Sequence, residues 1–371
     1  IIGTIWVDMS PASWRREIGQ CLIAGFNGVE IPVELKALAR EFGLGGVILF
    51  ARNIVEPEQV AATAFDACQL SADLPAWVSV DQEGGRVARL REPFTKWPPM
   101  ASLGRSGRVD LADRFAKALA AELSAVGITL DYAPVLDVHT NPKNPIIGDR
   151  ALAEEAGAVA RLGSVVIAGL QANGVAACGK HFPGHGDTSA DSHVDLPVVE
   201  HPLSRLREIE LVPFRAAVAA GVATIMTAHV LLPAIDDTRP ATLSPTVLGL
   251  LRGELGYDGV VLSDDLEMQA IAKQMDVPTA TVQAIQAGCD AVLVCGGDTG
   301  VQVAALEALV HAVETGVVPM AAIDDAMRRQ RAAKERILPE RPVRPSSARV
   351  LREVLGCVEH LKVADDMARF V

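Results

Sequence analysis

The chain has 371 residues, of which 50% are hydrophobic and 22% are charged, so it can bury a large core and is not intrinsically disordered. Its formal net charge is −12 and it contains no run of lysine and arginine, which argues against nucleic acid as a partner. The opening residues lack a basic segment and are soon followed by charged ones, so neither a signal peptide nor a membrane span is visible. We expect a globular protein without a membrane partner.

The six cysteines are scattered along the chain, and several of them lie in apolar runs that look like buried strands. This placement is typical of reduced thiols in the core of a cytoplasmic protein, and we expect that location. The six are Cys21, Cys68, Cys178, Cys289, Cys295 and Cys357.

Short apolar runs that end in glycine or polar residues alternate with segments of helical periodicity. The predicted strands are 21–25, 45–50, 77–80, 129–134, 175–179, 222–227, 259–263 and 291–295. The predicted helices are 10–20, 33–42, 57–71, 111–126, 151–173, 203–220, 247–255 and 277–288. This alternation predicts an α/β fold with a parallel sheet, and eight such units close into a (β/α)8 TIM barrel.

A doubly wound open sheet is the alternative for the same alternation. It would need a glycine-rich phosphate-binding turn after the first strand, and residues 25–28 do not match that pattern. Residues 1–338 are therefore predicted to form one barrel domain. Residues 339–371 begin rich in proline and arginine and then become helical, which predicts a linker and a helix that packs on the barrel.

Residues 180–193 (KHFPGHGDTSADSH) concentrate ionisable side chains directly after the fifth predicted strand. In a barrel the carboxyl ends of all strands face one opening, so polar residues that end different strands converge there. Carboxylates, imidazoles and cations together suit acid–base or carboxylate-nucleophile chemistry on a hydroxyl-rich substrate. The converging residues are Asp81, Arg89, Asn144, Arg150, Lys180, His181, Asp191, His193, His229, Asp264 and Asp265.

The three histidines and two aspartates of residues 180–193 also include enough ligands for zinc or manganese. Their spacing differs from the HExxH pattern, which places two histidines on one face of a helix. Lys180 would in addition set a cation beside the ion. We therefore expect no metal and no other cofactor, although a metal-dependent barrel hydrolase remains an alternative.

Five segments of the chain resemble glycoside hydrolase family 3, in its single-domain bacterial β-N-acetylhexosaminidase branch. They are 45–53 (GGVILFARN), 81–89 (DQEGGRVAR), 144–150 (NPIIGDR), 180–193 and 263–268 (SDDLEM). The resemblance implies a small carbohydrate substrate and hydrolysis of terminal β-linked N-acetylglucosamine with retention, as in muropeptide fragments of the cell wall.

The resemblance also implies roles for individual residues. Asp264 would be the catalytic nucleophile, His193 the general acid/base and Asp191 the partner that orients this histidine. Successive strand residues alternate in direction, so only one of Asp264 and Asp265 is expected to face the sugar, and the resemblance assigns Asp264. The positions that would bind the sugar are Asp81, Arg89, Arg150, Lys180 and His181.

Two further interpretations of the same site stay open. A phosphorylase is a close alternative, because a histidine acid/base lets anionic phosphate approach with less charge repulsion than a carboxylate would. A catalytically silent sugar-binding protein is the other, and a measurement of turnover separates it from an enzyme.

Overall fold

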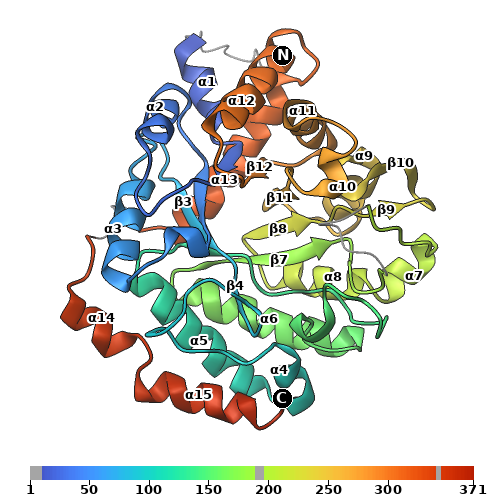
Figure 1. Cartoon of the computed structure of the whole chain (residues 1–371). Helices are drawn as coiled ribbons and strands as arrows, with labels where there is room; N and C mark the ends of the chain where they lie inside the picture. The colour runs from blue at the N-terminus through green and yellow to red at the C-terminus, as the bar shows by residue number, and fades with distance from the viewer. Residues whose placement is uncertain (1–10, 189–195, 340–343) are drawn as a thin grey trace, which may run out of the picture.

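The computed structural model describes residues 11–188, 196–339 and 344–371. Within them, eight parallel strands form a closed barrel in the order β1, β12, β11, β8, β7, β6, β3, β2, and helices surround it (Figure 1). This confirms the predicted (β/α)8 barrel. The strands are β1 Leu22–Ala24, β2 Gly46–Leu49, β3 Trp77–Val80, β6 Leu130–Asp131, β7 Ala176–Phe182, β8 Thr224–Thr227, β11 Val260–Asp265 and β12 Ala291–Val294.

Two short antiparallel hairpins lie outside the barrel sheet. They pair β4 (Gln82–Gly84) with β5 (Val87–Ala88) and β9 (Leu231–Leu232) with β10 (Asp236–Pro240). The first hairpin follows β3 directly, so it begins at the carboxyl end of the barrel.

Helices of the described residues cover the outside of the barrel. They are α1 Pro11–Gly19, α2 Val33–Phe42, α3 Pro57–Cys68, α4 Ala101–Ser106, α5 Val109–Ala125, α6 Ala156–Ala172, α7 Leu203–Glu208, α8 Leu211–Ala219, α9 Pro245–Gly249, α10 Gln269–Ala272, α11 Val277–Ala287, α12 Thr299–Glu314, α13 Met320–Ile337, α14 Ala348–Val354 and α15 Val358–Ala368. Helices α12 and α13 were not predicted from the sequence. They follow the last strand, which needs a helix of its own to cover it, and α12 supplies that helix.

Alternating side chains divide the core into two layers. In β1, Ile23 points into the barrel, whereas Leu22 and Ala24 pack against the surrounding helices. Trp77 and Tyr132 fill the barrel interior and are fully buried. The barrel is therefore a packed core rather than a channel.

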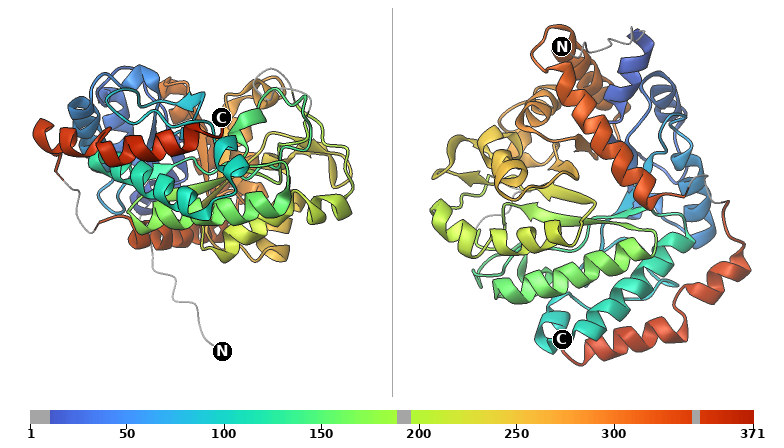
Figure 2. Two further views of the ribbon diagram at one scale, coloured as in Figure 1. Left: turned by 90° about the horizontal axis from the view of Figure 1, so that it is seen from below. Right: turned by 180° about the vertical axis from the view of Figure 1, so that it is seen from behind.

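Helix α13 closes the amino-terminal end of the barrel. Trp77 Nε1 donates to Gln330 Oε1 at 3.1 Å, and Lys334 Nζ donates to Gly45 O and to Gln20 Oε1, both at 2.8 Å. Gly45 and Trp77 lie where β2 and β3 begin, and Figure 2 (right), which views the molecule from behind, shows α13 crossing in front of the strands. The open end of the barrel is consequently the end where the strands finish.

Two strands extend further than the sequence predicted. β7 includes Lys180 and His181, which we expected to begin a loop, and β11 includes Asp264 and Asp265. Lys180 and His181 are only 2% and 7% exposed. Polar residues at these positions do not mark the end of the strand, because their charges are paired inside the fold.

The C-terminal helices α14 and α15 lie outside the ring of barrel helices, where they contact α3, α4 and α5 (Figure 1). Both follow the proline- and arginine-rich stretch of the sequence, and together they cover the outer side of α5. The division into a barrel domain at residues 1–338 and a C-terminal segment at 339–371 stays a prediction.

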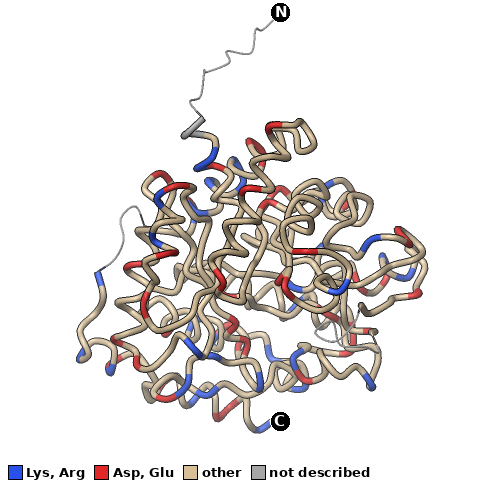
Figure 3. Tube along the Cα trace, turned by 45° about the horizontal axis from the view of Figure 1, so that its top comes forward, with Lys and Arg blue, Asp and Glu red and all other residues tan. Residues whose placement is uncertain are grey.

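Acidic and basic residues are interspersed along the described chain (Figure 3). All six cysteines are free thiols, and four of them are buried. None of the described helices is both long enough and apolar enough to cross a bilayer.

Candidate active site

A polar pocket of about 410 Å³ opens at the carboxyl ends of the barrel strands. Its lining includes six of the eight residues to which the resemblance gives a role, although they come from four different segments of the chain. The six are Asp81, Arg89, Arg150, Lys180, His181 and Asp264. The other two, Asp191 and His193, lie outside the described residues.

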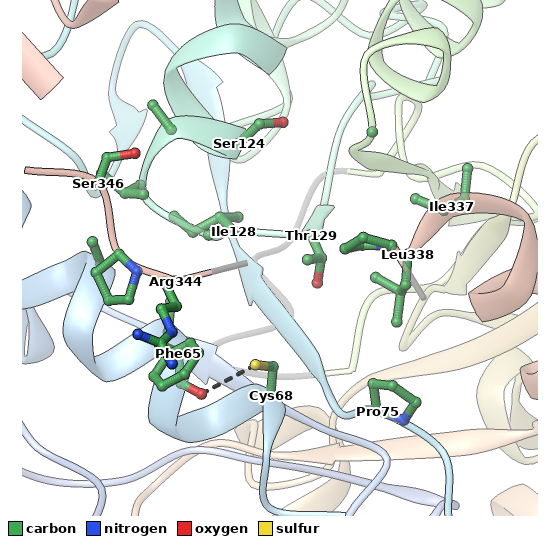
Figure 4. Close-up of a pocket in the computed structure, with 18 of the residues that line it drawn as sticks. Phe65, Cys68, Pro75, Ser124, Ile128, Thr129, Ile337, Leu338, Arg344 and Ser346 are labelled. Carbon is green, nitrogen blue, oxygen red and sulfur yellow. Dashed lines mark hydrogen bonds between the residues drawn. The ribbon is translucent and has the colours of Figure 1, made fainter. Parts of the chain in front are cut away.

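A second cavity of about 400 Å³ lies near the amino-terminal ends of β3, β6 and β7. Figure 4 shows its hydrophobic lining, which includes Phe65, Ile128 and Leu338. Cys68 also lines it, but burial raises the pKa of this thiol to about 11, so it stays protonated at neutral pH. No aspartate or glutamate appears among the described residues that line this cavity. Acid–base chemistry therefore belongs to the polar pocket.

Five charged side chains form a continuous ladder along the wall of the polar pocket. Arg89 lies 3.2 Å from Asp81, which lies 2.8 Å from Lys180. Lys180 in turn lies 2.6 Å from Glu83, and Glu83 accepts hydrogen bonds from two guanidinium nitrogens of Arg150, at 2.9 and 2.8 Å. Cations and carboxylates alternate along this ladder, so each charge has an opposite charge beside it.

The pairing keeps these groups ionised although they are buried. Burial alone would raise the pKa of Glu83, but the charges of Lys180 and Arg150 outweigh it and hold this pKa well below its usual range. Burial would likewise lower the pKa of Lys180, and the carboxylates of Asp81 and Glu83 raise it instead. The pocket therefore presents fixed, charged hydrogen-bond donors and acceptors, which suit sugar hydroxyl groups.

The β4–β5 hairpin brings Arg89 back to the end of β3. Gln82 accepts hydrogen bonds from the backbone N–H groups of Arg89 and Leu90 through Oε1, at 2.8 and 3.0 Å. Its own backbone N–H donates to Asp131 Oδ1 at 2.9 Å, at the end of β6. This network joins the hairpin to the barrel and places the Arg89 guanidinium beside Asp81.

Asp137 fixes the orientation of His181. Its Oδ2 lies 2.7 Å from His181 Nδ1, and its Oδ1 accepts from the backbone N–H groups of His181 and His185. Burial would raise the pKa of Asp137, but His181 lowers it, so the carboxylate is charged. An ionised partner favours a proton on Nδ1 and leaves Nε2 of His181 to face a ligand.

His185 also lines the pocket, beside His181. Its Nδ1 lies 2.7 Å from Thr188 Oγ1, and burial lowers its pKa to about 4. At neutral pH this imidazole is therefore uncharged. An uncharged imidazole can shape the pocket without adding another positive charge beside the charged ladder.

Asp264 and Asp265 both line the pocket, in contrast to the strict alternation that we expected. The register of β11 against β12 shifts between Leu262 and Asp265, and an irregularity of this kind re-aims side chains at a strand end. Their surroundings differ. Asp265 accepts from the backbone N–H groups of Glu267 and Cys295, whereas Asp264 accepts one hydrogen bond, from the Asp265 amide.

Burial raises the pKa of Asp265 to about 7, and the nearby carboxylates of Glu267 and Asp264 add to this effect. His229 lies behind it, with Nε2 at 2.9 Å from Asp265 O and Nδ1 at 2.8 Å from Thr242. Asp265 and His229 therefore brace the strand end. Of the two aspartates, Asp264 is the one whose side chain is less engaged with the backbone.

The described residues on either side of 189–195 are tied together. Asp187 accepts a hydrogen bond from Thr140 Oγ1 at 2.8 Å and is hydrogen-bonded to His201 Nε2. Asn144 donates to His185 O, so the chain is held beside the pocket immediately before this segment. Among the described residues, no group of three or more histidines, cysteines or acids has the arrangement of a metal site.

Two residues of this site were not predicted from the sequence. Glu83 lies inside the segment 81–89 that carried the resemblance, two residues after Asp81, but nothing local showed that it would join Lys180 to Arg150. Asp137 ends the apolar run that follows β6, which is the signal that could have identified it. Both are almost completely buried, and only their partners explain why.

Residues 14–332 match the model of the glycosyl hydrolase family 3 N terminal domain. A beta-hexosaminidase from Thiobacillus denitrificans is 45% identical over 259 residues, which cover 68% of this chain and 71% of that protein. A beta-hexosaminidase from Alkalilimnicola ehrlichii is 42% identical over 281 residues, 74% of this chain and 80% of that protein.

Solved structures agree with this match. The family 3 beta-N-acetylglucosaminidase from Paenibacillus sp. str. FPU-7 superposes with a TM-score of 0.90 at 44% identity, over 95% of this chain and 68% of that chain. NagZ from Neisseria gonorrhoeae, in complex with N-trifluoroacetyl-D-glucosamine, superposes with a TM-score of 0.76 at 30% identity, over 94% of this chain and 97% of that chain. Together with a pocket of paired charges around Asp264, these matches confirm the resemblance seen in the sequence: the chain is a glycoside hydrolase and belongs to family 3.

Proposed function

We propose that this glycoside hydrolase removes terminal β-linked N-acetylglucosamine from its substrate with retention of the anomeric configuration. The observation that carries the proposal is the position of the Asp264 carboxylate in a pocket whose wall is the ladder from Arg89 to Arg150. The name of the Paenibacillus relative, a beta-N-acetylglucosaminidase, supports N-acetylglucosamine as the sugar, and that of the Thiobacillus denitrificans relative, a beta-hexosaminidase, supports a β-linked hexosaminide.

In the first step, the ladder and His181 bind the hydroxyl groups of the sugar, and Asp264 attacks the anomeric carbon. The bond to the leaving oxygen breaks as a glycosyl ester forms on Asp264. The leaving oxygen takes a proton from His193, which we assign as the general acid. Asp191 is assigned as the partner that keeps this histidine basic and oriented.

In the second step, the neutral imidazole of His193 takes a proton from a water molecule, and the oxygen of that water attacks the anomeric carbon. The ester bond to Asp264 breaks, and the sugar leaves with its original anomeric configuration. The retained carboxylate is ready for another cycle. His185 and Asp187, which hold the chain just before residues 189–195, support a place for His193 near the pocket.

We further propose that the substrates are N-acetylglucosamine-terminated fragments of the cell wall, and that the enzyme acts in the cytoplasm. The free thiols support a reducing compartment, because buried pairs of cysteines in secreted proteins are commonly oxidised. Cell fractionation with an antibody against the protein tests the location.

A panel of nitrophenyl β-glycosides tests the proposed activity. We expect the N-acetylglucosaminide to be hydrolysed with the highest kcat/KM, and NMR of the product to show initial release of the β anomer. Parallel reactions with phosphate distinguish the acceptor: sugar 1-phosphate as the main product would establish a phosphorylase. Absence of turnover on the whole panel would refute the proposed function.

A further inference from the structure

The carboxylate of Glu122 joins three segments of the chain on the outer side of the barrel. Glu122 lies on α5 and is 1% exposed. Its Oε2 accepts from the Thr95 amide at 2.9 Å, and its Oε1 accepts from the Thr95 hydroxyl at 2.6 Å. The same Oε1 accepts from the Gly356 amide at 2.9 Å and lies 2.9 Å from His360 Nδ1. One buried carboxylate thus ties residues 93–99 to the C-terminal helices.

Backbone packing reinforces this junction. Gly356, between α14 and α15, has a φ of +57°, and a Cβ there would lie 2.5 Å from Pro93 O. Only glycine permits such a close approach with this backbone conformation. The C-terminal segment therefore rests directly on the backbone of the loop that Thr95 belongs to.

The other end of that loop supports the hairpin of the active site. Trp97 O accepts from the Gly85 amide at 2.9 Å, and a Cβ on Gly84 would lie 2.8 Å from Pro98 O. Gly84 ends β4 and Gly85 begins the turn of the β4–β5 hairpin, so this end of the hairpin packs on residues 97–99. The ring of Trp97 packs edge-on against Phe115 of α5, at 5.1 Å between centroids.

The hairpin carries two residues of the charged ladder, Glu83 and Arg89. Glu83 on β4 pairs with Lys180 and Arg150, and Arg89, just after β5, pairs with Asp81. A displacement of the hairpin would therefore move Glu83 and Arg89 relative to Lys180, whose position is set by the barrel strand β7.

We propose that Glu122 is a positioning residue for sugar binding, and that residues 344–371 influence the geometry of the sugar site through it. Gly356 and His360 of the C-terminal segment bind Glu122, and Glu122 binds Thr95. Residues 93–99 in turn support the β4–β5 hairpin in the position from which Glu83 and Arg89 reach their partners. These helices lie beyond the residues that match the family model, which end at 332. The inference rests on the proposed function only for the choice of sugar.

The test compares Glu122→Gln with Arg114→Gln in the full chain. Arg114 on α5 pairs with Asp366 on α15 at 2.9 Å, so its variant removes an ion pair between the same two helices but leaves the contacts of Glu122 with Thr95 and Gly356 in place. We expect Glu122→Gln to raise KM for the nitrophenyl N-acetylglucosaminide and the Kd for free N-acetylglucosamine about tenfold or more, because small displacements of binding groups are costly. Arg114→Gln should leave both unchanged. All measurements are made well below the thermal midpoint of each variant.

Amide hydrogen exchange supplies a readout that does not depend on the substrate. We expect faster exchange in peptides covering residues 82–99 of Glu122→Gln and unchanged exchange there in Arg114→Gln. Thr95→Val, a milder change, should also speed exchange in residues 82–99. Thr95→Ser, which keeps the hydroxyl, should exchange there as slowly as the wild type.

Two results would overturn the inference: a lower thermal midpoint for Glu122→Gln with unchanged exchange in 82–99, or equal effects of Glu122→Gln and Arg114→Gln on KM. Wild-type protein that cleaves a different glycoside would refute the proposed sugar alone. The exchange experiment and KM for that glycoside would then decide whether Glu122 positions the hairpin.

Discussion

Glu83 Oε1 lies 2.6 Å from Lys180 Nζ, although 97 positions separate these residues in the chain, and both side chains are at most 2% exposed. On its other side Glu83 receives two hydrogen bonds from Arg150. This carboxylate is the joint between two cations that we assign to sugar binding. Removing the charge of Glu83 should therefore lower both the stability of the fold and the affinity for the sugar.

We expect Glu83→Gln to lower the free energy of unfolding by about 3 kcal/mol, because breaking a buried ion pair leaves charge without compensation. KM should rise about tenfold as Lys180 and Arg150 lose their common partner. Urea denaturation and steady-state kinetics measure the two effects. Glu353→Gln is the matched control, since Glu353 pairs with Arg349 on the surface, and its change should stay within about 0.5 kcal/mol. Equal changes in the two variants would contradict the role of Glu83.

Asp264→Asn should reduce kcat at least about a thousandfold with little effect on the thermal midpoint, because it removes the nucleophile but no core packing. Asp265→Asn is the control and should lose much less activity. A 5-fluoro glycosyl donor should leave its sugar on Asp264, which peptide mapping by mass spectrometry locates. Label on Asp265 would exchange the two roles.

The buried carboxyl group of Asp265 should make stability depend on pH. Burial raises its pKa to about 7 from the ordinary value of 3.8, so the folded protein keeps this proton at pH values where the unfolded chain has lost it. The stabilisation from this group is complete below about pH 4 and is lost as the pH rises to about 7. Asp265→Asn stays neutral throughout.

The unfolding free energy of the wild type, relative to Asp265→Asn, should therefore fall by about 3 kcal/mol between pH 4 and pH 7. Urea denaturation of both proteins across this range measures the difference. A difference that does not change with pH would show that Asp265 is ionised at neutral pH in the folded protein.

His193→Ala should lose far more activity on a disaccharide than on a dinitrophenyl glycoside, because protonation matters most when the leaving oxygen is basic. Asp191→Ala should show the same pattern more mildly, since the imidazole remains. Measuring kcat/KM against the pKa of the leaving group provides the test. A uniform loss across leaving groups, with an unchanged pH profile, would refute the assignment of His193 as the general acid.

Exhaustive chelation should leave hydrolysis unchanged, because no step of the proposed mechanism uses a metal ion. Activity before and after treatment with a chelator, with elemental analysis of the purified protein, is the measurement. Loss of activity that zinc or manganese restores would favour the metal-dependent alternative for residues 180–193.

Local patterns in the sequence were sufficient for the barrel and for much of its active site. The period of apolar residues predicted each of the eight barrel strands, because a strand buried on both faces is a short apolar run with polar residues at its end. Because the carboxyl ends of all barrel strands face one opening, the sequence also predicted that Asp81, Lys180 and Asp264 would converge, and all three line one pocket. The catalytic and binding roles of the site residues stay predictions.

Other features follow only from the tertiary structure. Glu83 and Asp137 are charged residues whose burial depends on partners far away in the chain, and the register shift before Asp265 depends on the pairing of β11 with β12. The contact of Glu122 with Thr95 and Gly356 likewise joins segments that no local pattern relates. Residue order fixes periodicity over a few positions, so it determined the strands, the helices between them and the end of the barrel that carries the chemistry. Pairing of buried charges depends on which strand ends meet when the barrel closes, and only the folded chain decides that.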